Sequence, residues 1–176
     1  MSDSQAISSG SGSDPIDFSR HLIGSQGFSA LFEDSMTLVE ETAAYLDGPG
    51  RVDARTLTQA GRVAYAAESM RLTTRLMQLA SWLLLQRAVN KGEMTPEQAA
   101  VEKAKVKLNG LSSAMHGPGW DDLPTPLRNL IERSTALHTR IRRLDQAIGG
   151  DRAVRSASDN PVRNQLGRIV EAFAAQ

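Results

Sequence analysis

Three charged residues have the spacing and the chemistry to bind an anion. Glu68, Arg71 and Arg75 follow one another at intervals of three and four residues, which places them on one face of a helix. Two guanidinium groups on that face could clamp a carboxylate or a phosphate through paired hydrogen bonds. The alternative is a stripe of charges that faces solvent, and this is the commoner use of the spacing.

A second basic group occurs near the end of a predicted helix. It consists of Arg133, Arg140, Arg142 and Arg143. These arginines could bind nucleic acid, but they are spread around the helix and no aromatic residues lie between them to stack on bases. Basic residues in the last turns of a helix also stabilise the helix dipole, and we favour this explanation.

No motif of a metal, phosphate or nucleophile site accompanies these groups. The histidines, His21, His116 and His138, lie in three separate segments, and the sequence contains no HExxH motif. Gly48-Pro49-Gly50 and Gly117-Pro118-Gly119 lack the frame of a phosphate loop, and proline lacks the amide that such a loop uses. The sequence therefore predicts no catalytic residue, no metal and no cofactor.

The charged residues described above are predicted to lie on helices. Apolar residues at spacings of three and four predict a first helix over residues 28–46, which a Gly-Pro-Gly turn ends. A second, longer helix begins between residues 53 and 56 and runs to Val89, before Asn90-Lys91-Gly92. Its core side is predicted to consist of two adjacent seams: Tyr65, Ser69, Leu72, Leu76, Leu79 and Leu83, and beside them Val63, Met70, Met77 and Leu84.

Two further helices complete the prediction. One begins at Thr95 with a capping box, and its apolar side consists of Val101, Ala104, Leu108, Leu111 and Met115. The other begins near Thr125 and ends at Gly149-Gly150, with a core face of Leu127, Leu130, Ser134, Leu137, Ile141, Leu144 and Ile148. We therefore expect an all-α fold, an antiparallel three-helix bundle in which the helix after Thr95 is a short accessory helix.

The remaining side of the second helix changes character along its length. It begins with Ala64, Glu68, Arg71, Arg75 and Gln78, and it continues with Trp82, Leu85 and Val89. A helix that is apolar all round must be covered all round. We therefore predict that Trp82, Leu85 and Val89 lie in a protein–protein interface, most simply that of a homodimer. Burial by the other helices of the same chain is the alternative.

The two ends of the chain differ in composition from the bundle domain, residues 27–149. Residues 1–26 are rich in serine and glycine and are predicted to form a disordered arm. Residues 150–176 are predicted to form a flexible tail with a weak amphipathic helix. One face of that helix would present further interface residues: Val162, Leu166, Ile169 and Phe173.

Composition narrows the class of protein. The chain has 176 residues, no cysteine, and 20 basic against 20 acidic residues. A net charge of zero argues against a general binder of nucleic acid or of membrane surfaces. The lack of cysteine excludes disulfides and thiol chemistry. The sequence shows no signal peptide and no apolar run of about 20 residues, so a cytoplasmic location is expected.

Three stretches of the sequence resemble the RcdA family, regulators of CtrA degradation in alphaproteobacteria. They are TLVEETAAYLDGPGR at residues 37–51, YAAESMRLTTRLMQLASWLLLQRAV at residues 65–89 and LHTRIRRLD at residues 137–145. The resemblance covers about residues 28–148. It implies a dimeric helical bundle that serves as an adaptor for the ClpXP protease.

The resemblance also implies the partners of such an adaptor. It would dock on ClpX in a ClpXP protease primed by the response regulator CpdR. It would then deliver cargo such as CtrA, directly or through the further adaptor PopA, and recruitment to a cell pole is a related expectation. The main alternative is an all-helical dimeric enzyme of the chorismate mutase type, in which Glu68, Arg71, Arg75 and Lys91 would line the site.

Overall fold

The computed structural model describes residues 26–106, 108 and 119–158 of the chain. These residues form helices and loops and include no strand, which confirms the all-α fold. None of the described helices is long and apolar enough to cross a membrane. Several predictions fall outside the described residues: the N-terminal arm, His21, His116, and the tail positions Val162, Leu166, Ile169 and Phe173.

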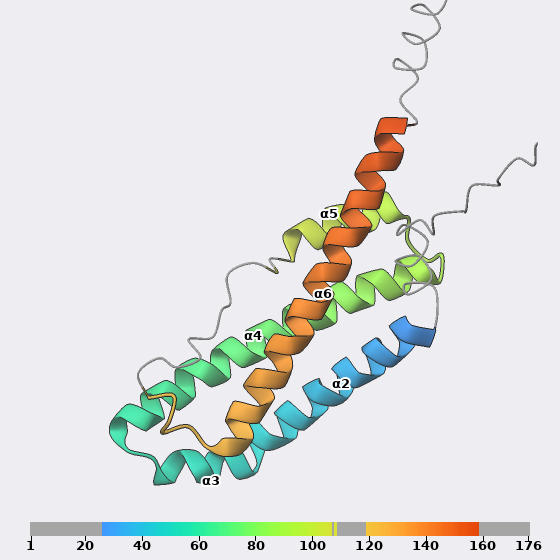
Figure 1. Ribbon diagram of the computed structural model, residues 1–176. Coiled ribbons are helices and arrows are strands. Elements are labelled where there is room, and N and C mark those ends of the chain that lie inside the picture. The colour runs from blue at the N-terminus through green and yellow to red at the C-terminus, as the bar shows by residue number, and fades with distance from the viewer. Residues whose placement is uncertain (1–25, 107, 109–118, 159–176) are drawn as a thin grey trace, which may run out of the picture.

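Three long helices form the bundle: α2 (Gln26–Asp47), α4 (Gln59–Asn90) and α6 (Thr125–Ser158) (Figure 1). Helix α2 runs antiparallel to the other two, as expected. Helices α4 and α6 instead run in the same direction, because Arg75 contacts Ser134 and Trp82 contacts Asp145, so that residue numbers rise together along both. The chain between them includes α5 (Pro96–Lys105) and connects the C-terminal end of α4 with the N-terminal end of α6.

Helix α2 buries one face, whose residues are spaced at three and four. Phe28, Leu31, Leu38 and Tyr45 lie in the core, and Ser35 and Thr42 lie beside them. The hydroxyl groups of Ser35 and Thr42 donate to the carbonyls of Leu31 and Leu38, over 2.5 and 2.7 Å. Each polar side chain can enter the core because its hydroxyl finds a partner on its own helix.

A short helix, α3 (Pro49–Thr56), separates α2 from α4 and was not predicted. Pro49 follows the end of α2 and also stands in the first turn of α3, where its fixed φ favours a helix. Gly50 packs so closely that a Cβ atom there would lie 2.5 Å from the hydroxyl oxygen of Tyr65. Helix α4 begins at Gln59, and the side chain of Thr58 caps it by accepting from the amide of Gly61.

The accessory helix α5 is shorter than predicted. The capping box of Thr95 and Gln98 is confirmed, but the helix ends at Lys105 and not at Met115. Val101 and Ala104 are exposed, so the predicted apolar side is wrong. A helix of ten residues buries only the strip that touches α4, and Ala99 and Lys103 occupy it. Leu108 is buried but follows the helix, and Leu111 and Met115 lie outside the described residues.

Helix α6 packs its predicted face on the core, with Leu137, Leu144 and Ile148 only partly buried, and it continues beyond its predicted end. Its core includes Leu127, Ser134 and Ile141, each fully buried. The helix runs through Gly149-Gly150 to Ser158, so the prediction of an end at these glycines is wrong. A glycine inside a helix costs only about 1 kcal/mol relative to alanine, and no proline follows until Pro161. The two glycines therefore weaken the helix without ending it.

The buried side of α4 is rotated relative to the prediction. Leu72, Leu76, Leu79 and Leu83 are buried, as expected. The second predicted seam is exposed, with relative exposures of 63% for Val63, 72% for Met70, 66% for Met77 and 53% for Leu84. Helices α5 and α6 pack on the other side of the buried leucines, so the buried arc extends toward Glu68, Arg75, Trp82 and Gln86.

This rotation predicts different costs for two leucine substitutions on α4. Leu79→Ala should lower the free energy of unfolding by about 2–5 kcal/mol, because it removes a buried side chain and leaves a cavity. Leu84→Ala should change it by about 0.5 kcal/mol or less, since that side chain is on the surface. Urea titration of both variants measures the difference, and equal losses would contradict the observed register.

Candidate protein-interaction surfaces

The charged group on α4 occupies two different environments. Arg75 and Glu68 are buried, with 1% and 6% exposure, whereas the side chain of Arg71 is 44% exposed. Nη1 of Arg75 donates to Oγ of Ser134 on α6 over 2.7 Å, and that Oγ donates to the carbonyl of Ile131 over 2.7 Å. The interpretation as a solvated stripe is therefore wrong for Glu68 and Arg75, because Arg75 fastens α4 to α6.

Glu68 compensates part of the cost of burying this guanidinium. Burial lowers the pKa of Arg75, and the negative charge of Glu68 acts in the opposite direction. One carboxylate oxygen of Glu68 accepts from Nη1 of Arg71, and the other is buried without a hydrogen-bond partner. Opposite charges that are buried together offset each other's desolvation, so the role of this group is structural.

The residues of the enzyme-like alternative do not converge on one site. Lys91 follows the last residue of α4, roughly 24 Å along the helix axis from Arg75. It pairs with Glu93, and Arg75 is directed into the bundle toward Ser134. A dianion could not contact all the proposed cations at once.

Trp82 is covered by its own chain. It is 1% exposed, and its indole Nε1–H donates to Oδ1 of Asp145 on α6 over 2.7 Å. Nζ of Lys103 on α5 lies 4.3 Å from the centre of the indole ring. Intramolecular burial, the alternative left open by the sequence, accounts for this residue. Leu85 and Val89 are partly exposed, and their place in a dimer interface stays a prediction.

The arginines of α6 do not act as one basic patch. Arg133 forms an ion pair with Glu41 on α2, and this hydrogen bond lowers the pKa of Glu41 and raises that of Arg133. Arg140, Arg142 and Arg143 are exposed. Because α6 continues to Ser158, these arginines do not lie in its last turn, and the helix-dipole explanation is wrong.

The remaining histidine has a local partner. Nε2 of His138 donates to the carbonyl of Leu108 over 2.6 Å, and this contact joins α6 to the chain after α5. Among the described residues, no three His, Cys, Asp or Glu side chains are grouped as metal ligands. In the described part of the chain, His138 therefore has a structural role, which is to connect α6 with the segment after α5.

The exposed seam of α4 gathers four of the six large hydrophobic residues that are exposed in the described part of the chain. We call it the outer face of α4; it consists of Val63, Met70, Met77 and Leu84, each more than half exposed. They share one face because seven residues make almost two full turns. That face lies opposite the buried leucines, since Met70 and Met77 each stand two residues, or about 200°, before Leu72 and Leu79. Large apolar groups that share one face and stay exposed typically mark a site of protein binding.

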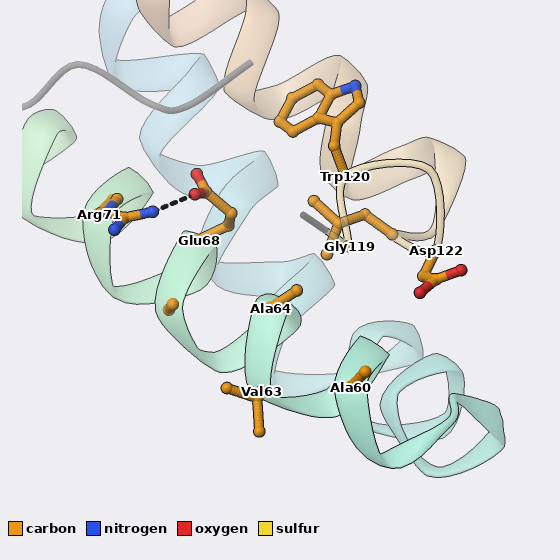
Figure 2. A pocket seen from close by; sticks show the side chains of 10 residues that line it. Ala60, Val63, Ala64, Glu68, Arg71, Gly119, Trp120 and Asp122 are labelled. Atoms are coloured by element: carbon orange, nitrogen blue, oxygen red, sulfur yellow. Dashed lines mark hydrogen bonds and ion pairs between the residues drawn. The ribbon is translucent and has the colours of Figure 1, made fainter. Parts of the chain in front are cut away.

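A groove of about 570 Å³ continues this face at the N-terminal end of α4. Small residues, Ala60, Ala64 and Ala67, line it on α4, and Trp120 and Leu123 line it from the segment before α6 (Figure 2). Gly119 makes the close approach possible: it has a φ of 81°, and a Cβ atom there would lie 2.8 Å from that of Ala64. Val63 belongs to both the outer face and the groove.

The sequence contained a signal for the outer face. Val63, Met70, Met77 and Leu84 repeat every seven residues, whereas the buried leucines repeat at three and four. Met70 and Met77 each stand two residues before a buried leucine, and two residues turn a helix by about 200°, so α4 is apolar on opposite sides. The number of helices in the bundle then decides which side is covered. The four residues were therefore recognised as apolar but were assigned to the core.

Comparison with known proteins shows similarity to a protein family and to a solved structure. Residues 19–173 match the family described as "Protein of unknown function (DUF1465)". The chain is also similar to RcdA from Caulobacter crescentus CB15, a crystal structure, with 50% sequence identity and a TM-score of 0.58. That match covers 70% of this chain and 92% of the RcdA chain. No curated protein matches the chain.

The contact between Arg75 and Ser134 predicts the effect of one small substitution. Ser134→Ala should lower the free energy of unfolding by about 1–3 kcal/mol, because the buried guanidinium loses an acceptor. Thr139→Ala, on the same helix, is the control, since this exposed hydroxyl donates only to the carbonyl of Thr135. Urea denaturation compares the two, and a Ser134 variant as stable as the control would show that the contact contributes nothing.

Proposed function

The chain belongs to the RcdA family, and from this premise we propose that it is an adaptor for the ClpXP protease. It would bind ClpX in a protease already primed by CpdR. It would deliver cell-cycle regulators of the CtrA type for degradation, some of them through the further adaptor PopA. The proposal places this activity in the cytoplasm, with recruitment to a cell pole.

The outer face of α4 carries the proposal. An adaptor acts by holding two proteins together, and it needs exposed binding surface more than reactive groups. Met70 and Met77 suit this task because methionine side chains are flexible and adapt to different partners. The charged residues of α4 that could have served an enzyme, Glu68 and Arg75, are used to pack the bundle.

The ends of the chain and the far part of α4 complete the proposal. The arm before α2 and the part of the tail after α6, residues 1–25 and 159–176, are predicted from composition to be flexible. They would act as tethers that raise the local concentration of cargo near the protease. Val162, Leu166, Ile169 and Phe173 would contact a partner. Self-association through Leu85 and Val89, both partly exposed, would give a homodimer.

A reconstituted degradation assay tests the adaptor function. Purified ClpXP and CpdR should degrade a CtrA-type response regulator faster when the full chain and PopA are added. The rate should rise and then fall with increasing adaptor, because excess adaptor binds cargo and protease separately. Omission of CpdR is the control and should abolish the gain. If the chain changes no degradation rate under any of these conditions, the proposal is wrong.

The tail residues allow a separate test. A variant that ends at Ser158 keeps all of α6, so we expect it to retain the melting temperature of the full chain. It should fail to deliver at least one cargo, because Val162, Leu166, Ile169 and Phe173 are missing. Thermal melting and the degradation assay measure the two effects. Full delivery of every cargo would remove the tail from the proposed function, and a lower melting temperature would make it structural.

A further inference from the structure

The outer face of α4 has the residue pattern of a surface that packs against another helix. Its large residues repeat every seven positions, and a small residue follows each of them by four: Ala67, Thr74, Ser81 and Ala88. Residues four apart are neighbours on a helix surface, so each large side chain has a small one beside it. Such alternation lets a second helix approach closely, with its side chains between the large residues.

The length of this surface also fits a helix. From Val63 to Leu84 it extends about 31 Å along α4, at about 1.5 Å per residue. No described element covers it, because α2, α3, α5 and α6 all contact other sides of α4. An occupant helix of three heptads would therefore contact all four large residues.

The charges of α4 determine which kind of helix fits. This helix has four arginines, Arg62, Arg71, Arg75 and Arg87, and one acidic residue, Glu68. Glu68 pairs with Arg71, and an excess of positive charge remains on the helix. Arg71 lies on the groove side of the outer face, whereas Arg87 lies on the α2 side, where it stacks on Phe32. A second α4 helix would bring further arginines to these margins, and like charges at an interface oppose association. A helix with carboxylates at its margins would instead be attracted.

We propose that the outer face of α4 binds an amphipathic helix of a partner protein, with apolar residues along its centre and acidic residues along both margins. A bulky apolar side chain at one end of that helix would enter the groove, where Ala60, Ala64 and Ala67 leave space beside Trp120. This deepens the proposed function, since it names the class of segment that the adaptor binds.

Two synthetic helical peptides test the proposal with the full chain. Both have leucine at seven-residue spacing on one face, and they differ only in having glutamate or lysine at the margins. We expect the glutamate peptide to bind at least about tenfold more tightly in fluorescence anisotropy, and its affinity to fall as salt is added. Equal affinities for the two peptides would overturn the proposal.

Substitutions on the chain locate the binding surface. Met70→Glu/Met77→Glu should weaken binding of the glutamate peptide at least about tenfold, because it adds like charge to the outer face. Val101→Glu is the control: it replaces another exposed apolar residue, on α5, and should leave the affinity unchanged. Both variants should keep the melting temperature of the unchanged chain, since all three residues are on the surface. Loss of binding only in the Val101 variant would place the site elsewhere.

A second copy of the chain is the competing occupant. Sedimentation equilibrium of the full chain and of Met70→Glu/Met77→Glu distinguishes it. If the substitutions convert a dimer into a monomer, the outer face is a self-association surface and the proposal is wrong. An unchanged oligomeric state supports it. The peptide-binding and sedimentation experiments use no protease. If they contradict the helix-binding proposal, the degradation assay can still show that the chain is an adaptor that acts through another surface.

Discussion

Helix α4 has more apolar surface than the other helices of its bundle cover. The side of α4 that is buried determines where the other helices pack. One side, centred on Leu72 and Leu79, is buried against α2 and α6. The opposite side exposes Val63, Met70, Met77 and Leu84. Burial of the first side stabilises the fold through the hydrophobic effect. A three-helix bundle leaves the second side available for another protein.

Polar contacts between helices fix this choice of side. Arg75 with Ser134 and Trp82 with Asp145 join α4 to α6, and the ion pair of Arg133 with Glu41 joins α6 to α2. A buried donor that loses its acceptor destabilises the fold by more than a typical surface contact stabilises it. The two pairs between α4 and α6 have buried donors, Arg75 and Trp82, and therefore specify one register. Lys103 on α5 packs over Trp82 and donates a hydrogen bond to Gln86. These contacts attach α5 to the C-terminal part of α4.

The buried face could be predicted from the sequence for helices that have a single apolar face. The faces of α2 and α6 were correct because their apolar residues repeat at three and four and their other sides are polar. The outer face of α4 could not be assigned, since that helix is apolar on opposite sides. Arg75 was assigned to solvent because its acceptor, Ser134, lies 59 residues away in the sequence, and periodicity within one helix does not report such a partner. The direction of α6 depends on the same long-range contacts.

The most direct measurement is methyl NMR of the full chain with labelled methionines. Met70 and Met77 lie on the outer face of α4, and the half-buried Met36 on α2 is an internal reference. On addition of CpdR-primed ClpXP and cargo, the Met70 and Met77 methyl signals should shift or broaden while that of Met36 stays in place. Unchanged Met70 and Met77 signals in the presence of bound partners would contradict the claim that the chain is an adaptor acting through this face.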